Sequence, residues 1–113
     1  MSGIVGVGVD IIEIERIKAA IQRQPRLVSR VFTAEERAHF AGRGAQTVAG
    51  CFAAKEAAVK ATGGGALSDA SLTWDENGKP SLTMRGRDDL RFFVSISHSR
   101  GHAVATVTAV VRE

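Results

Sequence analysis

Small apolar residues dominate Val48–Ala61, where the chain has no proline and, after Gly50, no glycine. Alanine is the strongest helix former, so the pattern predicts one long helix that starts at Ala45 or Gln46. The charged residues of its second half are Lys55, Glu56 and Lys60. A helix with so little polar surface is expected to be buried on several sides.

Strand patterns lie on both sides of this helix. Ile4–Val9 is a β-branched run with glycines, typical of a buried strand to which another backbone or a ligand comes close. Ala70–Asp75 and Pro80–Arg85 alternate apolar and polar residues around an Asn-Gly pair, which predicts a β-hairpin. Phe92–Ser97 and His102–Val111 predict two further strands.

Near the N-terminus, Ile11–Gln22 has apolar residues at helical spacing, and Pro25 is expected to end or bend that helix. Arg16 and Arg23 share the opposite face of the helix, within a long stretch of mainly basic charge. The simplest interpretation is a solvated face. A long cluster of one sign also favours an anionic partner.

Three shorter segments predict the start of a helix, the end of a helix and a possible single turn. Thr33 with Glu36 three residues later predicts the capped start of a short helix. The glycines Gly63 to Gly65 are expected to stop the long helix, because glycine suits a left-handed C-terminal cap. They also fit a loop whose backbone amides approach a phosphate. Arg87–Arg91 is polar and is compatible with one helical turn.

Length and composition narrow the class of protein. The chain has 113 residues, which predicts a single domain near the size where oligomerisation often adds stability. It has one cysteine, which fits a reducing compartment, and we expect a cytoplasmic protein without a membrane span. It lacks a serine-hydrolase elbow, a phosphate-binding Gly-Lys-Ser/Thr loop and a zinc-type cysteine and histidine spacing.

Two carboxylates stand in apolar surroundings. Asp10 is expected at the end of the first strand, and Glu56 lies on the long helix. The simplest interpretation of Glu56 is a surface ion pair with Lys60, four residues on, worth about 0.3–0.5 kcal/mol. Together, however, Asp10 and Glu56 are what Mg²⁺ prefers, namely few protein oxygens with the other positions left for water and phosphate.

At this point the chain resembles a known family. Four segments match, in register, the holo-[acyl carrier protein] synthases, which are short 4′-phosphopantetheinyl transferases. They are Gly6-Val7-Gly8-Val9-Asp10-Ile11, Phe52-Ala53-Ala54-Lys55-Glu56-Ala57 with Lys60-Ala61, Asn77-Gly78-Lys79-Pro80, and Val94-Ser95-Ile96-Ser97-His98-Ser99. Each segment alone is common, but together they cover nearly the whole chain.

The resemblance implies a fold and a reaction. The fold is α+β of the 4′-phosphopantetheinyl transferase type, with a small antiparallel sheet packed on the long helix. The reaction is the transfer of 4′-phosphopantetheine from coenzyme A to a serine of an apo acyl carrier protein. The short members usually form trimers with the active site between protomers, so we expect a homotrimer whose interface includes the apolar final strand.

The resemblance also implies site residues. Asp10 and Glu56 would hold Mg²⁺, Lys60 would act on the phosphate oxygens or the leaving group, and either Asp10 or a metal-bound water would take the serine proton. Arg16 and Arg23 would contact the carrier protein. The residues expected near coenzyme A are Gly63, Gly65, Gly78, Lys79, Pro80 and His98.

Two positions depart from the family pattern. Cys51 stands where the family commonly has an arginine that helps hold a coenzyme phosphate, and Thr62 stands where it usually has phenylalanine. A thiol cannot replace the five donors and fixed charge of a guanidinium. Either another cation, such as Arg43 or Lys79, compensates, or coenzyme A binds more weakly.

Two interpretations from other classes compete. A binding module could place its basic N-terminal segment on nucleic acid, although aromatic residues are scarce and no nucleic-acid motif is present. A structural oligomer would use Glu56 and Lys60 as an ordinary salt bridge. The transferase is favoured, with no nucleic acid or membrane as partner.

Overall fold

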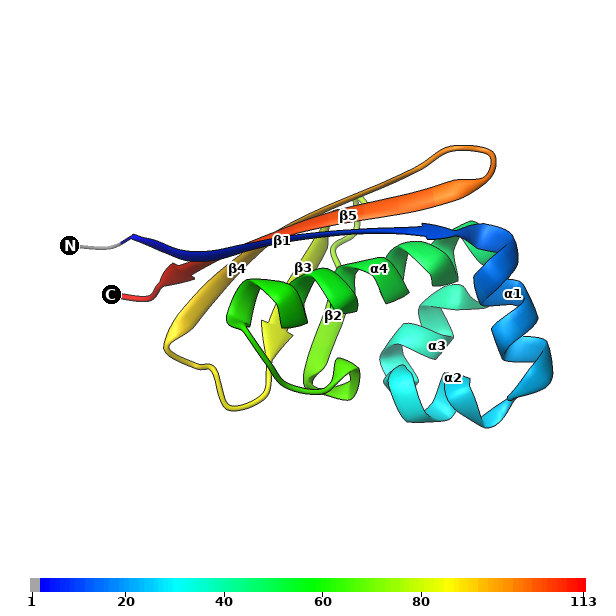
Figure 1. The fold of residues 1–113 in the computed structure, drawn as a ribbon, viewed down its shortest axis with the longest axis horizontal. Coiled ribbons are helices and arrows are strands. Elements are labelled where there is room, and N and C mark those ends of the chain that lie inside the picture. The colour runs from blue at the N-terminus through cyan, green and yellow to red at the C-terminus, as the bar shows by residue number, and fades with distance from the viewer. Residues whose placement is uncertain (1–2) are drawn as a thin grey trace.

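The computed structural model describes residues 3–113 (Figure 1). Its elements, in chain order, are β1 (Ile4–Glu13), α1 (Ile14–Arg23), α2 (Arg26–Val31), α3 (Ala34–Phe40), α4 (Ala45–Thr62), a short 3₁₀ turn η1 (Leu67–Asp69), β2 (Ala70–Trp74), β3 (Pro80–Met84), β4 (Leu90–His98) and β5 (His102–Val111). The expected α+β fold is confirmed.

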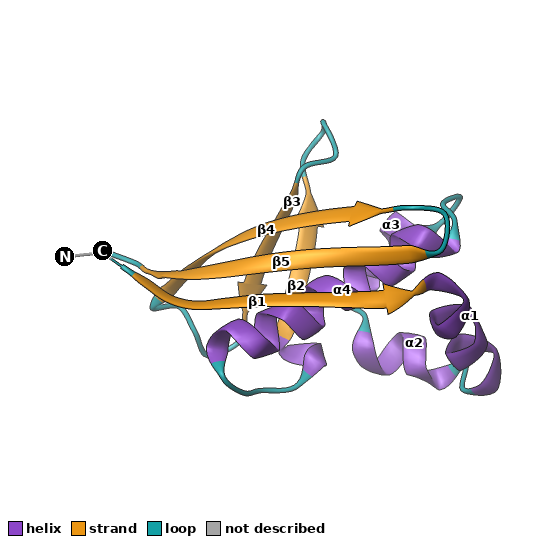
Figure 2. Ribbon diagram, turned by 45° about the horizontal axis from the view of Figure 1, so that its top comes forward, coloured by secondary structure: helices purple, strands orange, loops and turns teal. Residues whose placement is uncertain are grey.

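The strands form two antiparallel sheets around α4. The larger sheet has the order β1-β5-β4, so the C-terminal strand is central, and β2 pairs with β3 in a separate hairpin. The three long strands lie across α4, while α1, α2 and α3 gather at one end of the sheet (Figures 1 and 2). The helix is thus enclosed by the sheet, the hairpin and the smaller helices, as its composition predicts.

Glycines on β1 allow α4 to lie directly on the strand backbone. A Cβ atom on Gly6 would lie 1.7 Å from the carbonyl oxygen of Ala61, and one on Gly8 would lie 2.0 Å from that of Ala57. No side chain fits in either space, so the expected close approach of a neighbouring backbone is confirmed. The alanines of α4 that face the sheet are correspondingly buried.

The other face of the sheet carries several exposed apolar side chains in the single chain. On β1, the side chains of Val7, Val9 and Ile11 are 64%, 54% and 65% exposed, and Phe93 on β4 is 54% exposed. The prediction of a buried first strand is therefore correct for its glycine face and wrong for its valine face in this chain alone. A row of exposed apolar side chains along one strand is typical of an interface.

Two predicted boundaries are wrong, and one helix was not predicted. Asp10 is not at the strand end, because β1 continues to Glu13, and α1 therefore starts at Ile14 instead of Ile11. Pairing of Asp10 to Glu13 with β5 satisfies this backbone and overrides the helical spacing of the isoleucines. Pro25 not only follows the end of α1 but is also the N-cap of α2. The short helix α2 was not predicted from the sequence. Arg87–Arg91 forms no helix, but the N–H of Leu90 donates to the carbonyl oxygen of Arg87 and closes a single turn, after which β4 runs from Leu90.

A buried ion pair ties α3, α4 and β2 together. The Nζ of Lys55 lies 2.8 Å from the Oε1 of Glu36, and both side chains are fully buried. Lys55 also donates to the carbonyl oxygen of Ala70, and Glu36 accepts from the backbone N–H of Leu72 at 2.7 Å. Glu36 further completes the predicted capping box with Thr33. Both charges are therefore paired and hydrogen-bonded, as deep burial requires.

Candidate active site

Asp10, Glu56 and Lys60 come together where β1 crosses α4. The Nζ of Lys60 lies 3.2 Å from the Oδ1 of Asp10 and 3.0 Å from the carbonyl oxygen of Val9. Asp10 is mostly buried, whereas the Lys60 side chain is 54% exposed. No ion pair joins Glu56 to Lys60 within residues 3–113, so the surface pair suggested by their spacing does not form. The lysine reaches across to the strand instead.

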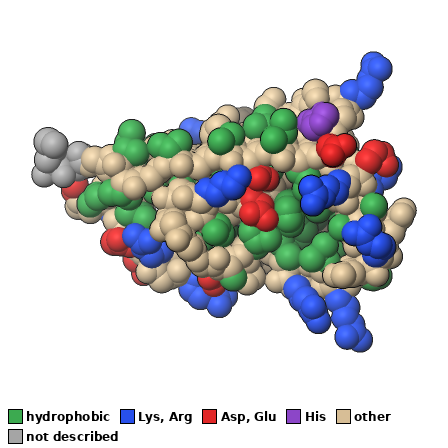
Figure 3. All heavy atoms as spheres, viewed as in Figure 1, with side chains coloured by type: hydrophobic (Ala, Val, Ile, Leu, Met, Phe, Trp, Pro, Cys, Tyr) green, Lys and Arg blue, Asp and Glu red, His purple; other side chains and the backbone are tan. Residues whose placement is uncertain are grey.

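The two carboxylates and Lys60 border one cavity of about 570 Å³. Arg16 and Arg23, the predicted partner-binding residues on α1, also line it. Its apolar lining includes Ile11, Ile12, Ile17, Ala20, Leu27, Val31, Phe52 and Leu67. Figure 3 shows acidic and basic side chains around an apolar patch on this face. The cavity thus combines carboxylates, cations and an apolar floor.

The donor set of this cavity fits Mg²⁺ better than a metal that needs a complete protein cage. Asp10 and Glu56 are two carboxylates on rigid elements, one on a strand and one on a helix. No cluster of three or more His, Cys, Asp or Glu side chains suited to a metal ion occurs in the described part of the chain. Mg²⁺ commonly uses one or two carboxylates together with water and substrate phosphate. Asp10 and Glu56 are therefore the residues of this cavity that could hold Mg²⁺.

A second cavity, of about 300 Å³, lies between α3, α4 and the strands. Of the residues expected near coenzyme A, it is lined by Gly78, Pro80 and His98. Lys79, between Gly78 and Pro80, does not line it in the described structure. Arg43 and Cys51 do line it, so of the two cations proposed to compensate for Cys51, Arg43 is the one that lines this cavity in the described structure.

Gly63 and Gly65 lie in the loop after α4 and line neither cavity in the described structure. Gly63 has φ 80° and its N–H donates to the carbonyl oxygen of Val59, so the predicted helix cap is confirmed. Gly65 also has a positive φ, of 103°. The loop leads to Leu67, which lines the first cavity, so a ligand there would lie near this segment.

Two residues of the second cavity were missed by the sequence analysis as functional candidates. His39 on α3 and Trp74 at the end of β2 stack with ring centroids 3.7 Å apart and planes 4° from parallel. Burial and, second, the Arg43 guanidinium lower the pKa of His39, which keeps its imidazole neutral at pH 7. No spacing links these positions, because the fold alone brings α3 next to β2.

The thiol of Cys51 is unreactive. Its thiol is buried, and burial together with the Glu36 carboxylate raises the pKa of Cys51 far above its ordinary value. Lys55 opposes this shift more weakly. A protonated thiol is uncharged and only a weak hydrogen-bond donor, so it contributes little to phosphate binding. The positive charge of this cavity must come from other residues.

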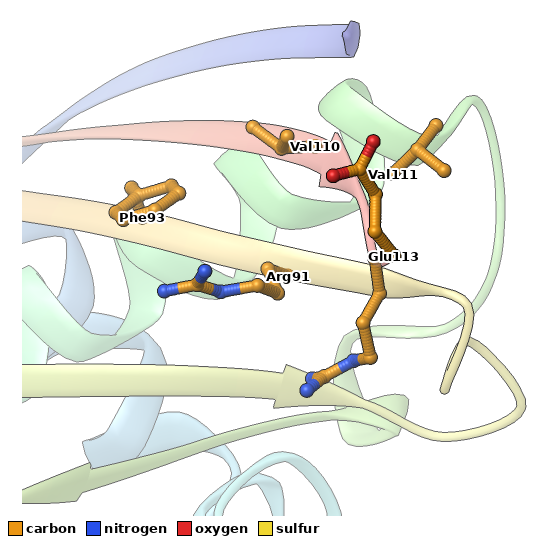
Figure 4. A pocket seen from close by; sticks show the side chains of 6 residues that line it. Arg91, Phe93, Val110, Val111 and Glu113 are labelled. Carbon is orange, nitrogen blue, oxygen red and sulfur yellow. The ribbon is translucent and has the colours of Figure 1, made fainter. Parts of the chain in front are cut away.

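A third cavity, of about 540 Å³, lies at the far end of the larger sheet (Figure 4). Arg91 and Phe93, both on β4, line it, with the guanidinium carbon of Arg91 5.3 Å from the ring centroid of Phe93. None of the predicted site residues lines it in the described structure.

No helix among residues 3–113 combines the length and apolar character needed to cross a bilayer.

A family model described as the 4′-phosphopantetheinyl transferase superfamily matches residues 6–107. The chain belongs to this superfamily. Within it, the chain is similar to the holo-[acyl-carrier-protein] synthase of Geobacillus kaustophilus, with 44% identity over 92% of this chain and 87% of the relative. The corresponding protein of Oceanobacillus iheyensis is 40% identical over 97% and 99% of the two chains. The family resemblance seen in the sequence is confirmed.

Solved structures of this superfamily share the fold. The holo-(acyl-carrier-protein) synthase of Bacillus anthracis, described as a complex with CoA (3′,5′-ADP), superimposes with a TM-score of 0.85 and 36% identity, covering 96% of this chain and 98% of the other. The holo-ACP synthase of Plasmodium yoelii gives a TM-score of 0.86 at 27% identity, covering 100% and 99%. The phosphopantetheinyl transferase fold therefore extends over the part of the chain that the structure describes.

Proposed function

We propose that this protein transfers 4′-phosphopantetheine from coenzyme A to a serine hydroxyl of an apo acyl carrier protein and releases adenosine 3′,5′-bisphosphate. The observation that carries the proposal is the meeting of Asp10, Glu56 and Lys60 in one cavity with Arg16 and Arg23. Relatives at 40–44% identity that carry the name holo-[acyl-carrier-protein] synthase support the same reaction. We treat residues 1–113 as one transferase domain.

In this proposal Asp10 and Glu56 hold Mg²⁺. When bound, the ion would neutralise charge on the pyrophosphate of coenzyme A and so reduce its repulsion of the incoming serine oxygen. Asp10 lies on β1 and Glu56 on α4, and the contact between the glycines of β1 and the backbone of α4 fixes their relative position. Both carboxylates line the same cavity, so a cation bound there would be within reach of the two elements that carry them.

Lys60 has the reach and the exposure to act on the phosphate. Its ammonium already contacts Asp10, yet the side chain is more than half exposed and extends into the cavity. It would donate to a phosphate oxygen during transfer or give a proton to the departing nucleotide. Asp10, or a water beside it, would accept the proton of the carrier serine.

The second cavity is the proposed nucleotide end of the coenzyme A site. Gly78, Pro80 and His98 line it, and Lys79 lies in the same turn. Gly63 and Gly65 would border the pantetheine-phosphate side, since their loop leads to the first cavity. In the single chain, the two cavities have no lining residue in common. A second copy of the chain that supplies one of the two cavities would join them into one site.

That division and the exposed apolar side chains of β1 and β4 support association between copies of the chain, and we propose a homotrimer because the short members of the family usually form trimers. Val7, Val9, Ile11 and Phe93 would be removed from water by neighbouring copies. We place the active site at this interface. The proposed setting is the cytoplasm, in fatty-acid biosynthesis, where apo acyl carrier protein is the acceptor.

The carrier protein is proposed to dock on α1. Arg16 and Arg23 line the same cavity as the catalytic carboxylates, so a partner bound to them would have its serine close to Asp10 and Glu56. An acidic helix of the carrier would complement these arginines. The nearby carboxylates also make the surface less suitable for nucleic acid, whose backbone they would repel.

The test of the proposal is product release. The protein is incubated with coenzyme A, and adenosine 3′,5′-bisphosphate is measured by chromatography. We expect its release to require both apo carrier protein and Mg²⁺. Release without carrier protein would indicate a hydrolase instead of a transferase, and no release with several apo carriers would contradict the proposal.

A further inference from the structure

The second cavity has a composition suited to one class of ligand. Aromatic rings of His39 and Trp74 form one part of its lining, Pro80 and Ile96 add apolar surface, and Arg43 supplies a cation. No carboxylate lines it in the part of the chain that the structure describes. Flat aromatic surface beside a fixed positive charge favours a planar base that carries a phosphate.

Arg43 is anchored beside the aromatic pair. Its Nη1 donates to the carbonyl oxygen of His39 at 2.7 Å, at the end of α3. A guanidinium has five N–H donors, so this bond leaves donors free for an anion. The anchoring also places the cation at a helix C-terminus, where positive charge is stabilised. The charge and the rings are thus held in one fixed arrangement.

The stack itself is held by secondary structure on both sides. His39 belongs to the last turn of α3, and Trp74 pairs with Pro80 across the hairpin. Both side chains are half-buried, so part of the aromatic surface stays accessible from the cavity. A neutral imidazole can pack on a ring, and accept a further ring, without the cost of removing a charge from water.

We propose that the stacked His39–Trp74 pair is the surface against which the purine ring of coenzyme A packs, with Arg43 holding a phosphate of the same nucleotide. The inference rests on the proposed function and adds to it a specificity-determining pair. It explains how this chain can bind the nucleotide with Cys51 in place of an arginine: aromatic packing and Arg43 share the contribution that the missing guanidinium would make.

Trp74 is the only tryptophan, so its fluorescence reports directly on this cavity. The wild-type protein is titrated with coenzyme A, with adenosine 3′,5′-bisphosphate and with 4′-phosphopantetheine, which has no base. Free N-acetyltryptophanamide, titrated in parallel, corrects for light absorbed by adenine. We expect saturable quenching by the two nucleotides and none by 4′-phosphopantetheine.

Calorimetry of the same mixtures distinguishes a failure of this inference from a failure of the proposed function. If coenzyme A binds while the corrected emission of Trp74 stays constant, the aromatic pair is not the base site and only this inference is overturned. If coenzyme A does not bind at all, the proposed function is overturned and the inference with it.

Two matched variants extend the test to catalysis. Trp74→Leu removes the flat ring, and we expect the KM for coenzyme A to rise about tenfold with kcat unchanged, the usual size of a base-stacking contribution. Trp74→Phe keeps an aromatic ring and is expected to restore most of the affinity. A merely structural role would instead lower kcat and thermal stability in the leucine variant without changing the KM for coenzyme A.

Discussion

The ammonium group of Lys60 lies 3.2 Å from the Oδ1 of Asp10, although fifty positions separate the two residues in the chain. Lys60 also donates to the carbonyl oxygen of Val9, so it is fastened to β1 at two points. The proposed catalytic lysine and a proposed metal ligand are therefore in direct contact, so we expect a change at one to affect the other.

Replacement of Lys60 tests this relationship. In Lys60→Met we expect kcat to fall about 10²–10³-fold, because a charge that stabilises the phosphate oxygens is lost. Mg²⁺ should bind at least as tightly as in the wild type, since a cation beside Asp10 has been removed. Steady-state kinetics and calorimetry with Mg²⁺ measure the two quantities. A kcat within twofold of wild type would rule out a catalytic role for Lys60.

The contact between β1 and α4 gives a second prediction. In Gly8→Ala the new methyl group would lie 2.0 Å from the carbonyl oxygen of Ala57, which is backbone and cannot move aside. We expect a loss of at least about 1–3 kcal/mol in the free energy of unfolding and a lower kcat, because α4 must shift. Gly101→Ala is the control, since no atom lies within 4 Å of its added Cβ. Equal stability of the two variants in urea denaturation would contradict the account.

The buried pair Glu36–Lys55 gives a third prediction. Lys55→Met leaves a fully buried carboxylate without its cation, so we expect a loss of about 3–5 kcal/mol in the free energy of unfolding. The exposed pair Glu15–Lys18 is the control, and Lys18→Ala should cost less than about 1 kcal/mol. Chemical denaturation measures both. A Lys55→Met protein as stable as the Lys18→Ala protein would show that Glu36 does not need this partner.

A fourth prediction distinguishes Arg43 from Lys79 as the cation near the coenzyme phosphate. Arg43 and Cys51 both line the second cavity, and Lys79 does not line it in the described structure. In Arg43→Ala we expect the KM for coenzyme A to rise roughly tenfold or more, the size of one charge-assisted hydrogen bond. The KM for 3′-dephospho-coenzyme A should change little if the contact is to the 3′-phosphate.

Lys79→Ala is the matched control for that experiment, because it removes a nearby charge from the neighbouring turn. A larger effect of Lys79→Ala than of Arg43→Ala would reverse the assignment. Cys51→Arg, made in the Arg43→Ala protein, is expected to recover part of the lost affinity, since it restores a guanidinium to the same cavity.

Local patterns account for most of the elements. The composition of α4, the Asn-Gly hairpin and the alternation of β5 predicted those elements within a few residues. The start of α1 could not be predicted, because pairing of β1 with β5 through Glu13 outweighs the helical spacing of the isoleucines. Non-local pairing of this kind leaves no trace in a short window of sequence.

The candidate site shows the same limit. Asp10 and Glu56 could be chosen from their apolar surroundings, and they do share a cavity. The alternative of a surface salt bridge between Glu56 and Lys60 is not what the structure shows, because the nearest oxygens to the Lys60 ammonium come from β1. The stack of His39 on Trp74 joins a helix to a strand that is distant in the sequence, and only the fold reveals it.

The most direct test of the central claim is the intact mass of an apo acyl carrier protein after incubation with this protein, coenzyme A and Mg²⁺. Wild type and Glu56→Gln are compared side by side. The account predicts a gain of one phosphopantetheine with the wild type, abolished by a chelator and by Glu56→Gln. An equal gain with both proteins would contradict the role of Glu56 as a metal ligand, and no gain with any apo carrier protein would contradict the transferase itself.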